Sequence, residues 1–248
     1  MIKVATVQFA PQFKAKTENL RALAELVSEA AENDAQLIVL PELAAVGYSF
    51  MGYEDAAPYA EVLNSDSQSM GIMKALSTRY NCGIAWGLIE KDEGTGKLYN
   101  SQVLVVPDAW ESYRKVNLWG NDFLWASEGR GNPSVLRVDF DGLEQKKVGL
   151  LICRDIRDRK DGEWQSFYEP GDADIVVMSS NWGNGGFPAV GWIDFAKDNH
   201  TTLVVSNRYG KETPNDFGEG GVCIIGPDGK VEIDGLVWNQ NCIVYGEV

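Results

Sequence analysis

A cysteine at the end of an apolar segment is the residue of this chain best suited to nucleophilic chemistry. Residues 148–152 have the length and composition of a buried strand, Cys153 follows them, and the next two residues, Arg154 and Asp155, are charged. In open α/β sheets, ligands bind outside the carboxyl ends of the strands, so a thiol at this point would meet a substrate. A free cysteine also commonly serves as a small core residue. This segment alone leaves both interpretations of Cys153 open.

A thiol nucleophile needs a group that accepts its proton, and histidine is the usual partner. His200 is the only histidine of the chain, and its polar setting between a helix-like segment and a strand favours a surface or capping role. Two other strand ends offer different groups. Glu42 follows an aliphatic run and Pro41, which cannot donate to a central ladder, and Lys115 follows a strand-like segment. A cysteine hydrolase of this sequence would therefore use a carboxylate or a lysine.

The order and spacing of these residues resemble the nitrilase or carbon-nitrogen hydrolase superfamily. Glu42 in Pro-Glu-Leu, Lys115 in Tyr-Arg-Lys and Cys153 after a hydrophobic run are weak signals singly, but they occur in order at family-like intervals. The similarity covers nearly the full chain, with further matching segments at residues 5–11, 87–90, 99–101 and 220–229. It implies a Glu-Lys-Cys triad and an α/β fold, a four-layer α-β-β-α sandwich with mixed sheets.

The segment after Lys115 departs from the family pattern. The family often has a second glutamate seven residues before a glycine, and the same count from Gly129 gives Asp122, whose side chain is one methylene shorter. Glu128 is the other acid in reach, so the assignment of an auxiliary acid stays open between Asp122 and Glu128. The family also commonly has histidine two residues after the lysine, where this chain has Asn117.

The resemblance also implies a mechanism. Glu42 takes the thiol proton of Cys153, and the thiolate adds to an amide carbonyl or nitrile carbon. Lys115 and the backbone N–H that follows Cys153 stabilise the developing oxyanion. Ammonia or an amine leaves, and water activated by Glu42 hydrolyses the thioester. This chemistry requires no cofactor and no metal.

Three functions follow from these residues. The favoured one is an amidase that releases ammonia from a small carboxamide or carbamoyl compound. A nitrilase that converts a nitrile to a carboxylic acid is the alternative in the same class, because no residue distinguishes the two. A catalytically silent scaffold of the same fold is the third, and the intact triad argues against it. Three residues are candidates for substrate binding by position, Arg154 beside the cysteine and Asn181 and Trp182 at a strand end. The resemblance implies that the loop with Tyr48 lines the pocket, although its aromatic side chains could equally serve ordinary packing.

Strand-like and helix-like segments alternate along the chain, which is typical of α/β proteins. Expected strands lie at residues 2–9, 37–40, 83–89, 101–106, 110–113, 135–140, 146–152, 173–182, 203–206, 222–225 and 231–233. Expected helices begin at residue 17 and cover residues 67–79 and 192–199. The early β-α-β unit favours a parallel pair with a helical crossover, and the late hairpins imply a mixed sheet. We expect one domain over residues 1–248.

Composition limits the partners and the location. The 248 residues carry a formal net charge of -14, which argues against binding to nucleic acid or to an anionic membrane. Four scattered cysteines without a Cys-x-x-Cys pair suggest neither zinc nor disulfides. No signal-peptide layout or membrane-length apolar run is present. We therefore expect a soluble cytoplasmic protein with a small-molecule amide or nitrile substrate, and the resemblance implies a homodimer or higher homo-oligomer.

Overall fold

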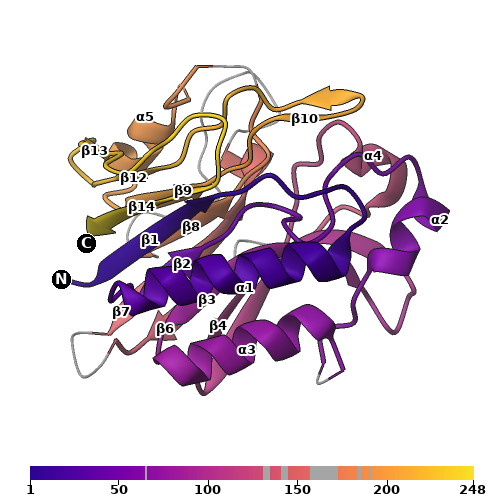
Figure 1. Ribbon diagram of the computed structural model, residues 1–248, viewed down its shortest axis with the longest axis horizontal. Coiled ribbons are helices and arrows are strands. Elements are labelled where there is room, and N and C mark those ends of the chain that lie inside the picture. The colour runs from indigo at the N-terminus through magenta and orange to yellow at the C-terminus, as the bar shows by residue number, and fades with distance from the viewer. Residues whose placement is uncertain (65, 131–134, 141–144, 157–172, 184–185, 190) are drawn as a thin grey trace.

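The computed structural model describes residues 1–64, 66–130, 135–140, 145–156, 173–183, 186–189 and 191–248. Two six-stranded sheets pack against each other, with helices outside them (Figure 1). The first sheet has the order β14 (Cys242–Glu247), β1 (Lys3–Gln8), β2 (Leu37–Val39), β3 (Gly83–Lys91), β4 (Leu98–Val106) and β5 (Ala109–Arg114). The second has the order β13 (Val231–Glu232), β12 (Cys223–Ile225), β9 (Thr202–Ser206), β8 (Ile175–Ser179), β7 (Lys146–Ile152) and β6 (Val135–Val138).

Both sheets combine parallel and antiparallel pairs. In the first, β1, β2 and β3 are parallel neighbours, while β14, β4 and β5 join them antiparallel. In the second, β7, β8 and β9 are parallel, and the other three strands are antiparallel additions. The remaining elements are α1 (Lys16–Glu32), α2 (Tyr53–Ala56), η1 (Ala57–Tyr59), α3 (Gln68–Tyr80), α4 (Asp122–Trp125), η2 (Cys153–Ile156), α5 (Trp192–Asp198) and the short pair β10 (Lys211–Glu212) and β11 (Asn215–Asp216).

Alternation of side chains along the strands produces four layers. In β2, Leu37 and Val39 join the apolar cluster between the two sheets, whereas Ile38 joins the cluster under α1 and α3. In β8, Val177 points into the same central cluster, and Met178 packs toward α5. Successive side chains of a strand point to opposite faces, so strands covered on both sides are apolar throughout. The predicted α/β class and four-layer α-β-β-α sandwich with mixed sheets are confirmed.

Most of the predicted elements are present within a few residues of their expected bounds. Three strands were not predicted. The short strands β10 and β11 pair with each other, and β14 pairs antiparallel with β1, which brings the two ends of the chain side by side (Figure 1). Asp141 and Gly142, which predict a turn between the strands expected at residues 135–140 and 146–152, lie outside the described residues, as do the charged residues 157–160.

Buried polar side chains connect the two sheets next to the strand ends that carry the candidate residues. The amide of Gln102 in β4 donates from Nε2 to Ser179 Oγ at 2.9 Å and accepts at Oε1 from the Leu151 N–H at 2.9 Å. The Ser179 hydroxyl in turn donates to the Leu40 carbonyl oxygen at 2.8 Å. Buried hydrogen bonds have preferred distances and angles. These contacts therefore fix the positions of β2, β4, β7 and β8 relative to one another.

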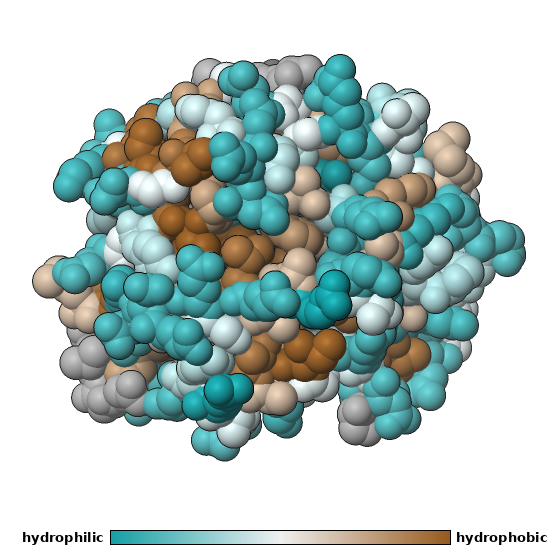
Figure 2. Space-filling view, in the orientation of Figure 1, coloured by the Kyte–Doolittle hydropathy of each residue, from teal (hydrophilic) through white to brown (hydrophobic). Residues whose placement is uncertain are grey.

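The visible surface is largely hydrophilic. Figure 2 shows hydrophilic residues over most of one face, with hydrophobic side chains reaching it in separate patches. The four cysteines are buried free thiols. Among the described residues, no helix is both long and apolar enough to cross a bilayer.

A glycine in β3 lets the segment that carries Glu42 approach closely. A Cβ at Gly87 would lie 2.5 Å from the Leu43 nitrogen and 2.7 Å from the Glu42 Cα. We therefore expect Gly87→Ala to displace Glu42 and to lower the free energy of unfolding by about 1–3 kcal/mol, the usual range for overpacking. Chemical denaturation measures this change.

Gly71 in α3 provides the matched control, because a Cβ there would meet nothing within 4 Å. Gly71→Ala should stabilise the helix by about 0.5–1 kcal/mol. Equal effects of the two substitutions would contradict the assignment of Gly87 as a close-approach position.

Candidate active site

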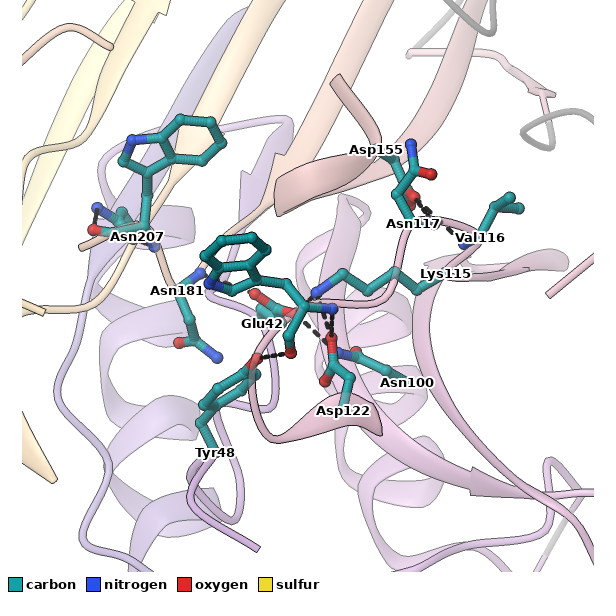
Figure 3. Close-up of polar contacts among 12 residues, drawn as sticks. Glu42, Tyr48, Asn100, Lys115, Val116, Asn117, Asp122, Asp155, Asn181 and Asn207 are labelled. Carbon is teal, nitrogen blue, oxygen red and sulfur yellow. Dashed lines mark hydrogen bonds and ion pairs between the residues drawn. The ribbon is translucent and has the colours of Figure 1, made fainter. Parts of the chain in front are cut away.

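Glu42 lies just beyond the carboxyl end of β2. Pro41, which precedes it, has no backbone N–H to continue the hydrogen bonding of the strand. Its side chain is fully buried, and both carboxylate oxygens accept hydrogen bonds. Oε1 accepts hydrogen bonds from Asn100 Nδ2 at 2.7 Å and from Lys115 Nζ at 2.7 Å, and Oε2 accepts one from the Asn181 backbone N–H at 2.8 Å (Figure 3). Three donors from three different segments therefore fix the orientation of this carboxylate.

Lys115 follows β5 and connects two acids. Its ammonium lies 2.7 Å from Glu42 Oε1 and 2.7 Å from Asp122 Oδ2, and its side chain is 1% exposed. Asp122 also accepts hydrogen bonds from Asn100 Nδ2 at 3.0 Å and from the Trp119 N–H at 3.1 Å. Glu128, the other acid considered from the sequence, is exposed. The structure thus brings Asp122 to Lys115.

The buried charges set the pKa values of one another. Burial alone lowers the pKa of Lys115, but Asp122 and Glu42 outweigh it and hold this pKa well above its usual value. Burial raises the pKa of Glu42, and the nearby Lys115 only partly offsets the rise. Lys115 therefore stays a cation, whereas Glu42 is better able to accept and return a proton than an exposed carboxylate.

Cys153 lies at the turn from β7 into η2, with a backbone φ of +44°. This left-handed conformation is costly for a residue with a Cβ, and such strain is concentrated at functional sites. Burial, then the charge of Glu42, raises the pKa of the Cys153 thiol to about 12, against the lowering effects of Lys115, the Ser180 side chain and the Asn181 N–H. At neutral pH the thiol is therefore protonated and needs a base to become a nucleophile.

Asp155 ties the Lys115 loop to the turn at Cys153. Its Oδ1 accepts from the backbone N–H groups of Val116 at 3.2 Å and Asn117 at 2.6 Å (Figure 3). Its Oδ2 accepts from the Tyr113 hydroxyl at 2.9 Å. The sequence placed Asp155 beside the cysteine but gave no sign of these contacts, which depend on the packing of β5 against β7. Asn100 lies in one of the segments that match the family, but the sequence gave it no role. In the structure its side chain bridges Glu42 and Asp122.

Tyr48 and Asn181, two of the four predicted substrate-binding residues, lie at the cluster. The buried Tyr48 hydroxyl donates to the Trp119 carbonyl oxygen, and its pKa is raised by burial and then by Asp122. Asn181 contacts Glu42 through its backbone, while its own side-chain amide is buried and has no hydrogen-bond partner among the described residues. An unpaired buried amide costs free energy, so Asn181 is well placed to bind a polar ligand.

The other two predicted substrate-binding residues, Arg154 and Trp182, are only partly buried. The Arg154 guanidinium stacks over the Trp119 ring at 4.5 Å from its centroid, and Trp182 packs edge-on against Trp192. His200 is exposed after α5 and has a φ of +50°, in agreement with the predicted surface or capping role. Within the described ranges, no group of three His, Cys, Asp or Glu side chains could hold a metal ion.

Comparison with known structures supports the fold. An amidase from Nesterenkonia sp. AN1, which bears acrylamide at its active-site cysteine in a glutamate-to-glutamine variant, aligns with a TM-score of 0.77 and 19% sequence identity, over 100% of this chain and 93% of that one. Its cysteine-to-serine variant, described as a nitrilase-superfamily amidase, aligns with the same TM-score at 20% identity over 100% and 91% of the two chains.

Sequence comparisons agree with the structural ones. A nitrilase from Pyrococcus abyssi is 32% identical over 62% of this chain and 56% of its own. A protein N-terminal amidase from Saccharomyces cerevisiae is 29% identical over 74% of this chain and 45% of its own. The chain thus spans about half the length of these curated relatives. The carbon-nitrogen hydrolase family model matches residues 3–248, and the protein therefore belongs to the carbon-nitrogen hydrolase family.

Proposed function

We propose that the protein is a cysteine-dependent amidase that releases ammonia from a small carboxamide or carbamoyl compound. The observation that carries the proposal is the buried contact of Lys115 with Glu42, next to a cysteine held in a strained turn. Relatives named omega-amidase and protein N-terminal amidase support the choice of an amide substrate.

The first half of the reaction forms a thioester. Glu42 accepts the thiol proton of Cys153, and the sulfur adds to the amide carbonyl carbon. Two of the three N–H donors of Lys115 bind Glu42 and Asp122, which leaves the third for the oxyanion, together with the backbone N–H of Arg154. When the tetrahedral intermediate collapses, the carbon-nitrogen bond breaks and Glu42 returns its proton to the departing nitrogen.

The second half restores the enzyme. Glu42 accepts a proton from water as the oxygen adds to the thioester carbonyl, and the carbon-sulfur bond then breaks. The acid product leaves and the thiol regains its proton from Glu42. Asp122 stays bonded to Lys115 throughout and holds the cation in place. A single carboxylate can serve both halves because burial keeps its pKa above the usual range.

Two other functions were considered from the sequence. A nitrilase would use the same residues, and the relative from Pyrococcus abyssi bears that name. A silent scaffold is opposed by energetics: burial of a lysine between two carboxylates is costly or at best neutral compared with apolar packing. A protein without chemistry to perform would gain nothing from this cluster or from a strained cysteine.

The proposed roles predict which variants lose activity. Cys153→Ala, Cys153→Ser, Glu42→Gln and Lys115→Ala should each lower ammonia release by about a thousandfold or more, because each removes the nucleophile, the base or the oxyanion cation. The measurement is ammonia release from a panel of amides, carbamoyl compounds and nitriles, with circular dichroism to establish folding.

The control is His200→Ala, which should retain normal turnover because His200 is exposed beyond α5. Normal turnover by Glu42→Gln together with an inactive His200→Ala would show a cysteine-histidine hydrolase instead. Turnover of nitriles alone would assign the protein as a nitrilase.

Asp155 gives the folded protein a pH dependence of its own. Burial raises the pKa of Asp155 from 3.8 to about 7, against the lowering effects of Lys115, the Asn117 N–H and the Tyr113 hydroxyl. The folded state therefore binds this proton more tightly than the unfolded chain. The resulting stabilisation is complete below about pH 4 and is lost as pH rises to about 7.

Asp155→Asn should remove this dependence, since an amide does not titrate in this range and its oxygen still accepts from the two backbone N–H groups. The free energy of unfolding of the variant, relative to the natural protein, should increase between pH 4 and pH 7. Denaturant titrations across that range measure the difference. If the difference in free energy of unfolding between the variant and the natural protein stays constant with pH, Asp155 does not have a raised pKa in the folded state.

A further inference from the structure

A cavity of about 550 Å³ lies beside the catalytic cluster, and five of its eleven described lining residues are aromatic. Its lining includes Trp182, Phe187, Trp192, Phe217 and Trp238, with Glu219 as the one charged residue of the described lining. These residues come from the segment after β8, from α5 and from two loops near the carboxyl end of the chain. None of them has a part in the reaction steps above.

The aromatic rings meet as adjoining walls. Trp182 and Trp192 have centroids 5.4 Å apart at an interplanar angle of 67°. Phe187 meets Trp192 at 85° and Trp238 at 88°. In an edge-to-face pair only one ring face is covered by the partner, so rings packed at steep angles leave other faces free to act as cavity walls. Aromatic boxes of this kind bind ammonium groups, because the face of each ring carries partial negative charge.

The charges around the cavity also favour a cation. Glu219 is exposed at the cavity, and its carbonyl oxygen accepts from the Asn239 N–H at 2.9 Å, which holds the Trp238 loop beside it. The nearby Arg208 is buried, pairs with Glu212 and covers one face of Phe217, so its charge is already compensated. A carboxylate ligand would therefore meet Glu219, and the described lining residues include no cation to offset it.

Two contacts connect the cavity to the catalytic cluster. Trp182 directly follows Asn181, whose N–H faces both Glu42 and the Cys153 sulfur. On the other side, Phe217 packs edge-on against Tyr48 with centroids 5.9 Å apart. An amide whose carbonyl carbon lies at Cys153 could thus extend its far end along Asn181 into the box.

We propose that this cavity binds the cationic end of the substrate, an alkylammonium group carried on the chain that also bears the amide. The inference rests on the proposed amidase function and narrows it to cationic amides. Trp182, Phe187, Trp192 and Trp238 supply the aromatic walls, and Glu219 supplies the opposing charge.

A matched pair of substrates tests the charge alone. Butyramide bearing a terminal trimethylammonium group and its tert-butyl isostere have the same shape, and unsubstituted butyramide serves as the reference. We expect kcat/KM for the ammonium compound to exceed that for the isostere by about tenfold or more. A ratio of one or less, with butyramide still hydrolysed, would overturn the proposal and leave the amidase function intact.

Variants locate the effect. Trp238→Ala and Glu219→Gln should each lower the ratio toward one. The control for Trp238→Ala is Trp110→Ala, because the two tryptophans are similarly exposed, at 44% and 42%. The control for Glu219→Gln is Glu93→Gln, at another exposed acid. Both controls should keep the full ratio. An unchanged ratio in Trp238→Ala and Glu219→Gln would also overturn the assignment.

A binding measurement separates failure of this proposal from failure of the amidase function. Calorimetric titration of Cys153→Ala with the two butyramide derivatives requires no turnover. Tighter binding of the ammonium compound supports the cavity even if no amide is hydrolysed, whereas equal binding of the two overturns it.

Discussion

The contact of Lys115 with two buried carboxylates is the interaction on which the rest of the site depends. One cation between Glu42 and Asp122 leaves the cluster with an excess negative charge inside the protein. Burial makes that charge costly, and the cost appears as the raised pKa values of Glu42 and of the Cys153 thiol. The raised pKa makes Glu42 a better acceptor for the thiol proton of Cys153, and the transfer leaves the net charge of the cluster unchanged.

Such a cluster needs a rigid support, which the two facing sheets provide. Glu42, Lys115 and Cys153 each follow a different strand. The Gln102 and Ser179 hydrogen bonds fix two of these strands, β2 and β7, across the sandwich, and β5, which precedes Lys115, pairs with β4. The polar groups lie where regular strand pairing ends. Pro41 has no N–H to donate to a neighbouring strand, and a φ of +44° at Cys153 is incompatible with extended backbone. Close approach at Gly87 completes the arrangement.

The sequence predicted the parts of this arrangement that depend on local pattern. Apolar runs that end in polar residues marked Glu42 and Cys153, and the alternation of elements predicted the α/β class. The sequence did not decide whether Asp122 or Glu128 is the auxiliary acid, and it did not predict the contacts of Asp155. Both depend on segments that meet only after folding. Strand β14 was missed for the same reason, since its partner β1 lies at the other end of the chain. The single domain and the homo-oligomer stay predictions.

The central claim is that Glu42 and Lys115 turn a protonated Cys153 into a nucleophile that forms a thioester. Its most direct test is mass spectrometry of the protein after rapid acid quenching during turnover of an amide. We expect the mass of one acyl group on the peptide that contains Cys153, and no adduct in Lys115→Ala. Rapid ammonia release without any adduct on Cys153, together with the same release by Cys153→Ala, would contradict this claim.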